Sequence, residues 1–146
     1  MPTHTTSRSS VGTPTARGPL LALRSLALLS TLNVLFQGLT AGELLMRSHS
    51  ARDLHETGAI VLHVLTGLTM VAAAIYWRAS RAGLWTTVLA AVVFVVTFVQ
   101  ASFGHGRTLY IHVPLALLLL LGAAWVLAWS WLVPRPAAST GADAGR

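Results

Sequence analysis

Residues 109–133 read LYIHVPLALLLLLGAAWVLAWSWLV, a run of 25 residues without a single acid, arginine or lysine. A helix needs about 20 predominantly apolar residues to cross the hydrocarbon core of a bilayer. This stretch therefore predicts a transmembrane helix. Three more apolar stretches precede it, at residues 19–46, 54–77 and 82–103. Each is also long enough to span a membrane, so the sequence predicts four spans.

The composition agrees with a membrane protein. Hydrophobic residues make up 54% of the 146 residues and charged residues only 10%, whereas soluble domains carry about 25% charged residues. A chain of this length forms one domain. The net charge of +6 comes from ten arginines and no lysine. These arginines lie between the apolar stretches and in the tails, so we predict a lipid bilayer and no nucleic acid as the partner.

The flanks and links predict the topology. Residues 1–18 are rich in Ser, Thr, Pro and Gly and predict a disordered tail; residues 134–146 predict a second polar tail. With the N-terminus in the cytoplasm, seven arginines fall on cytoplasmic segments and three on outer loops, as the positive-inside rule requires. We therefore predict a multi-pass cell-membrane protein with both termini cytoplasmic. Short links make neighbouring helices antiparallel, which predicts an all-α, up-down-up-down four-helix bundle.

The two halves of the chain contain a weak repeat. The first half carries FQGLTAG and then LHETGAIVLH, and the second carries VQASFG and then YIHVPLALLL. Gln37 corresponds to Gln100, and His55 corresponds to His112. Both halves enter the membrane from the same side, which predicts a parallel repeat of helix pairs about an axis normal to the membrane.

Polar groups within a membrane are costly and are functional hypotheses by default. His55 and His112 fall near the outer starts of the second and fourth helices, so we expect them at similar depth on diagonal helices. Neutral imidazoles are axial ligands of haem. The pair therefore predicts a haem b site, with Gln100 at the same level as a hydrogen-bonding partner for a ligand or a haem edge.

Gln37 and His63 are further candidates for cofactor binding. His63 follows His55 by eight residues, about 12 Å deeper along a helix, and Gln37 lies near the same depth. A hydrogen bond between Gln37 and His63 is the favoured interpretation over a ligand role. Gly38 and Gly42 form a small-xxx-small pair, which predicts close approach of helix backbones or space for a flat cofactor.

Other interpretations of these residues stay open. Interfacial histidines are often satisfied by water or by loop carbonyls. A surface zinc or copper site built from four histidines is a third possibility; its ligands would be His49, His55, His105 and His112. Glu56 could support His55, or it could simply sit favourably in the first turn of its helix.

At these residues the chain resembles one four-helix half of the haem A synthase-like membrane proteins. The matching segments are LHETG with His55 and VQASFGHGRTLYIHVPLALLL with Gln100, Gly104, Thr108 and His112. The chain is also similar to a family of small uncharacterised four-helix bacterial membrane proteins, which share the Gln-then-Gly first helix and the two histidine positions. The resemblance covers residues 32–121 and implies a four-helix fold and haem ligation.

The departures limit what the resemblance implies. Haem A synthase has two such halves, and its family carries an arginine directly after the first histidine, where this chain has Glu56. We therefore predict no catalytic residue. The first hypothesis is haem b binding for electron transfer or haem handling. The second is a cofactor-free membrane scaffold or accessory subunit, with a membrane protein or a second copy of the chain as partner.

Overall fold

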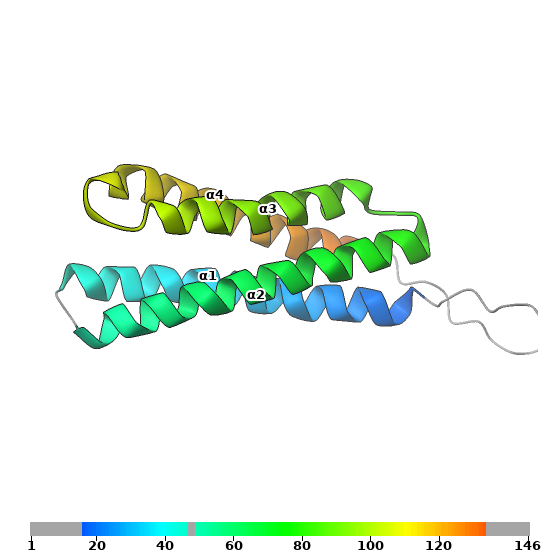
Figure 1. Ribbon diagram of the computed structural model, residues 1–146. Coiled ribbons are helices and arrows are strands. Elements are labelled where there is room, and N and C mark those ends of the chain that lie inside the picture. Colours follow the sequence, from blue (N-terminus) through cyan, green and yellow to red (C-terminus); the bar gives the residue numbers. More distant parts are fainter. Residues whose placement is uncertain (1–15, 47–48, 134–146) are drawn as a thin grey trace, which may run out of the picture.

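The computed structural model describes residues 16–46 and 49–133, and these residues are almost entirely helical (Figure 1). The elements are α1 (Arg17–Leu45), α2 (His49–Ser80), α3 (Leu84–Ser102), the single 3-10 turn η1 (Gly106–Thr108) and α4 (Leu109–Leu132). All four long helices are long and apolar enough to cross a membrane. The predicted fold class and the four spans are confirmed in the described part of the chain.

Two helices begin earlier than the apolar stretches predicted. α2 begins at His49, five residues before the predicted Leu54. α1 begins at Arg17, two residues before the predicted Pro19. The sequence pattern marks only the apolar span, whereas a helix continues into the polar region as long as its backbone bonds are made. The predicted tails at residues 1–15 and 134–146 lie outside the described residues.

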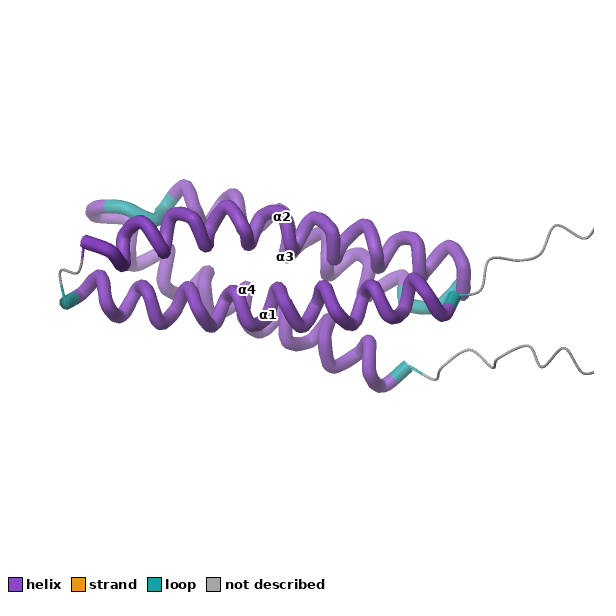
Figure 2. Tube along the Cα trace, turned by 90° about the horizontal axis from the view of Figure 1, so that it is seen from below, coloured by secondary structure: helices purple, strands orange, loops and turns teal. Residues whose placement is uncertain are grey.

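The four helices alternate in direction and close into a ring. Each packs against its neighbours in the order α1, α2, α3, α4 and back to α1, while α2 and α4 lie diagonally opposite. The start of α1 and the end of α4 lie at one end of the bundle (Figures 1 and 2). We call this the terminus end. The opposite end, which holds the α1–α2 and α3–α4 links together with His55 and His112, is called the histidine end.

The interior of the bundle is built from small residues and hydroxyls. Buried positions are mostly Ala, Ser and Thr, with a few Leu and Val, whereas most of the large aliphatic and aromatic side chains point outward. Lipid tails are as apolar as Leu, so membrane helices gain from close contact at small residues and leave bulky side chains to the lipid. The exposed apolar surface therefore fits a protein surrounded by lipid.

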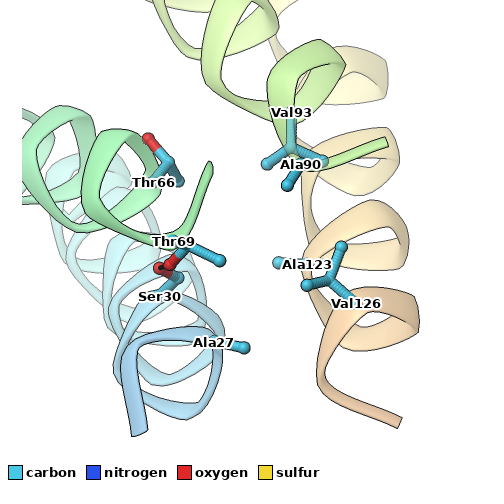
Figure 3. Close-up of a pocket in the computed structure, with 8 residues that line it drawn as sticks. All are labelled: Ala27, Ser30, Thr66, Thr69, Ala90, Val93, Ala123 and Val126. Carbon is cyan, nitrogen blue, oxygen red and sulfur yellow. Dashed lines mark hydrogen bonds between the residues drawn. The ribbon is translucent and has the colours of Figure 1, made fainter. Parts of the chain in front are cut away.

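Polar side chains link neighbouring helices. The hydroxyls of Ser30 on α1 and Thr69 on α2 are 3.0 Å apart at mid-depth. Nearer the terminus end, the Thr87 hydroxyl in the first turn of α3 lies 3.1 Å from the carbonyls of both Ala73 on α2 and Gly83. A cavity of about 10 Å³ lies beside the Ser30–Thr69 pair, lined by two residues from each helix (Figure 3). Its walls are almost wholly apolar and contain no histidine, so it is a packing void away from the predicted site.

Candidate functional site

His55 and His112 face each other at the histidine end. His55 lies in the second turn of α2, and His112 lies in the first turn of α4. Their ring centroids are 6.3 Å apart, and the ring planes are inclined by 51°. Both side chains are half-buried. Two helices that do not touch each other thus bring two imidazoles together, at the equal depth that the sequence predicted.

The ring of His55 is anchored from α1. Its Nδ1 lies 2.9 Å from the Thr40 hydroxyl oxygen. That hydroxyl also lies 3.2 Å and 3.1 Å from the carbonyls of Phe36 and Gln37 on its own helix. A threonine hydroxyl has one proton and two lone pairs, so while it donates to one of these carbonyls it can accept from the His55 ring. In that arrangement the His55 proton is on Nδ1, and the lone pair on Nε2 has no partner among the described residues.

The ring of His112 is held twice by one residue of α3. Its Nδ1 donates to the Gln100 backbone carbonyl at 2.9 Å, because a carbonyl can only accept. Its Nε2 accepts from the Gln100 side-chain amide at 3.0 Å. The predicted partnership between Gln100 and a site histidine is present. His112 is thus protonated on Nδ1, and its Nε2 lone pair is already engaged by Gln100.

Gln37 reaches α2 at His55 instead of His63. Its amide donates to the backbone carbonyl of His55 at 3.0 Å. Its Oε1 atom is buried without a hydrogen-bond partner. This contact needs Gly58, because a Cβ there would lie 2.5 Å from the Gln37 amide nitrogen. The repeat therefore places both glutamines against the matching histidine, one on its backbone and the other on its ring.

His63 lies apart from this pair. Its Nδ1 donates to the Ala59 carbonyl at 2.6 Å on its own helix, and its ring packs edge-on against Phe98 of α3 at 4.2 Å between centroids. The predicted hydrogen bond between Gln37 and His63 is wrong. Gln37 is level with Gly58, so His63 lies about one turn further along α2, where its ring contacts α3.

The loop histidines do not complete a metal site with the pair. In residues 16–46 and 49–133, no group of three or more His, Cys, Asp or Glu side chains is placed to hold one metal ion. His105 is exposed in the α3–α4 link, and the side chain of His49 lies outside the described residues. The structure thus gives no support to a zinc or copper site made of four histidines. Glu56 is exposed on the surface of α2.

The glycines near the site have different surroundings. A Cβ at Gly104 would lie 3.3 Å from Cε1 of His112, so this link residue must be small for the ring to pack against it. Gly38 and Gly42, in contrast, have open space at the position of a Cβ. The predicted close approach of helix backbones at Gly38 and Gly42 is not found within the described chain.

Sequence reasoning missed Thr40 and the burial of Arg24. Thr40 stands three residues after Gln37, and residues three apart lie on one helix face. That spacing is the signal that could have placed its hydroxyl beside the same partner helix. Arg24 was counted only as a cytoplasmic charge, but its side chain is 6% exposed. No acid within reach along the helix signals this burial.

The chain matches no family model, no curated protein and no solved structure. What can be said of its function therefore depends on the geometry at the histidine end and on the chemistry of its side chains.

Proposed function

We propose that this integral membrane protein binds haem b at the histidine end, with His55 and His112 as the axial ligands, and serves in electron transfer or haem handling. The observation that carries the proposal is the opposed pair of imidazoles on diagonal helices, 6.3 Å apart between ring centroids. Both histidines would hold the haem iron, each through a ring nitrogen.

The donor set fits a metal porphyrin. Ligating histidines usually donate their second ring N–H to a carbonyl, a carboxylate or water, which fixes the tautomer. His112 donates Nδ1–H to a backbone carbonyl, and His55 donates Nδ1–H to a hydroxyl. Two imidazoles alone are too few for a structural zinc ion, which takes four ligands. A porphyrin supplies four nitrogens of its own and needs two axial ligands from the protein.

The protein residues have distinct parts in this proposal. His55 offers Nε2 with no competing hydrogen bond. His112 offers Nε2 once the Gln100 amide moves away, while the Gln100 carbonyl keeps the ring oriented. Haem bound in this way exchanges single electrons at its iron, at a potential set by the ligands and by the hydrogen bonds around them. The resemblance to the haem A synthase-like halves supports the same ligand pair.

A cofactor-free scaffold or accessory subunit is the second candidate, and one observation favours it. Both ring nitrogens of His112 are already bonded to Gln100, so this pair is complete as an interhelical contact. Contacts of this kind contribute about 0.6 to 2 kcal/mol each in membrane proteins. In this second candidate the histidines join helices, and the chain presents its outer surface to a membrane partner.

The deciding experiment is a reduced-minus-oxidised absorption spectrum of the purified protein, produced in membranes with a haem supply. The proposal expects Soret and alpha bands of a six-coordinate haem b, both lost in His55→Ala and in His112→Ala. His105→Ala is the matched control, because it removes an exposed imidazole from the same end. A colourless wild-type protein, or bands unchanged in both site variants, would contradict the proposal and favour the scaffold.

A further inference from the structure

Arg24 is a buried cation at the terminus end, far from the histidines. It lies on α1 and is 6% exposed. Its Nε donates to the Ser130 carbonyl near the end of α4 at 2.9 Å. Its guanidinium carbon lies 4.7 Å from the centroid of the Trp131 ring. The carbonyl is one of the last in α4, which have no partner within the helix, so Arg24 ties the first helix to the last.

Among residues 16–46 and 49–133, no acid lies at this end to balance the charge. The four acids of the chain are Glu43, Asp53, Glu56 and Asp143. The first three lie at the end of α1 and the start of α2, which is the histidine end. Asp143 lies outside the described residues. A buried charge is strongly unfavourable unless it is paired, and neither a carbonyl dipole nor an aromatic face neutralises a full charge.

The terminal nitrogens of Arg24 are available to a ligand. Hydrogen bonding in the described residues uses only Nε. The buried side-chain atoms without a partner are Asn33 Oδ1 and Gln37 Oε1, so the terminal guanidinium nitrogens of Arg24 reach the surface of the bundle. The residue is seven positions into α1, about 10 Å from its start, and its side chain contacts the last turn of α4. The guanidinium therefore lies between α1 and the end of α4.

We propose that the phosphate of an anionic phospholipid headgroup binds to Arg24 between α1 and the end of α4. A planar guanidinium with two free donor groups suits bidentate contact with phosphate oxygens. Exposed Trp131 and Trp85 at the same end place their rings at the level of lipid headgroups, where such side chains concentrate. Arg17 lies seven residues earlier on the same face of α1 and adds to the local positive charge. This site is independent of the haem proposal.

The test compares lipid retention by native mass spectrometry. The full chain is exchanged into mixed micelles of phosphatidylglycerol and phosphatidylcholine with identical acyl chains, and the bound lipids are counted. We expect the wild type to keep one phosphatidylglycerol in preference to phosphatidylcholine. Arg24→Gln should reduce this preference about fivefold, the effect of one basic residue near an anionic surface. Arg78→Gln removes an exposed charge at the same end and is the matched control.

Each outcome decides for or against the site. Equal losses in Arg24→Gln and Arg78→Gln would mean diffuse attraction and overturn the proposal. A wild type without preference would also overturn it, whether or not the variants fold. Arg24→Lys keeps the charge without the planar fork, and we expect a smaller loss than in Arg24→Gln. A preference that appears only after Asp143→Asn would mean that the C-terminal tail neutralises Arg24, which contradicts the proposal.

Discussion

The two halves of the bundle use the same residue pair in different ways. In α1 and α2, the Gln37 amide contacts the backbone of His55, and Thr40 holds the ring. In α3 and α4, the side chain and the backbone carbonyl of Gln100 both contact the ring of His112. The sequence repeat is therefore preserved in position but not in bonding.

The two histidine rings are oriented in the same way, but they differ in whether the Nε2 lone pair is free to bind a ligand. Both rings are oriented through Nδ1 and carry their lone pair on Nε2. Only His55 presents that lone pair without a competing donor, whereas the Gln100 amide occupies the lone pair of His112. If the site binds haem, His55 is the preformed ligand, and His112 becomes a ligand when one hydrogen bond is exchanged. The predictions below test this asymmetry, beginning with the largest effect.

The largest effect is expected from Thr40→Val, which removes the acceptor for the His55 ring proton. Loss of such an orienting contact lowers metal affinity by about 10- to 100-fold, so we expect haem affinity to fall by that factor in a titration of the apoprotein. Thr31→Val is the matched control, because the Thr31 hydroxyl, like that of Thr40, lies against the carbonyl four residues before it on α1, here that of Ala27. Equal affinities in the two variants would show that Thr40 does not position His55.

Next in size is the contrast between the two glycines. A Cβ at Gly104 would press on the doubly bonded His112 ring and on the Ala101 carbonyl, both at 3.3 Å. Crowding of this kind costs about 1 to 3 kcal/mol. At Gly58 the displaced group is the end of the flexible Gln37 side chain. Its lost hydrogen bond, about 1 kcal/mol, is offset by a similar gain in helix propensity.

We therefore expect Gly104→Ala to lower the thermal unfolding midpoint and to alter the haem bands. Gly58→Ala should leave both nearly unchanged. Thermal unfolding in detergent, followed by circular dichroism, measures the first property, and the absorption spectrum measures the second. A larger effect of Gly58→Ala than of Gly104→Ala would contradict the view that the glutamine contacts the histidine ring only in the Gln100–His112 pair.

A smaller effect of opposite sign is expected from Gln100→Ala. This change removes the amide that competes for His112 Nε2, while the backbone carbonyl still orients the ring. Because a neutral hydrogen bond contributes about 1 kcal/mol, haem affinity should rise about fivefold. In a cofactor-free scaffold, the same variant would only lose stability. The direction of the change in a haem titration therefore distinguishes the two candidate functions.

The smallest effect concerns the hydroxyl pair that joins α1 to α2 at mid-depth. Ser30→Ala removes one hydroxyl, but Thr69 keeps its bond to the Leu65 carbonyl. We expect a loss of about 0.6 kcal/mol in the free energy of unfolding, the average for such contacts in a membrane. Ser102→Ala, which removes an exposed hydroxyl, should cost less. A loss above about 2 kcal/mol would show that the Ser30–Thr69 pair stabilises the bundle more than one such hydrogen bond does.

Much of the fold could be predicted because bilayer thickness sets the length of apolar segments. The spans, the alternating direction and the diagonal placement of α2 and α4 all followed from segment length and short links. The inward face of each helix could not be predicted in the same way. Lipid and bundle interior are equally apolar, so hydrophobic periodicity does not distinguish them. For that reason Gly38 and Gly42 were expected inside the bundle but lie on open surface.

The site was predictable in part for a related reason. Polar residues within a membrane are few, so the residues His55, His112 and Gln100 stood out, and their depth followed from the helical rise. Their partners depend on where each helix begins and on rotation about its axis. Because α2 begins at His49 and not at the predicted Leu54, Gln37 is level with Gly58 instead of His63 and contacts the backbone of His55. Thr40 was not singled out because threonine is common in membrane helices.

The bond between Arg24 and Ser130 joins residues 106 positions apart, and this bears on the order of assembly. The first helix enters the membrane with its cation long before the last helix has been synthesised. Until α4 arrives, neither the Ser130 carbonyl nor the Trp131 ring can receive Arg24. Arg24 therefore gains these two partners only in the last step of assembly, when α4 packs against α1 and closes the ring of helices.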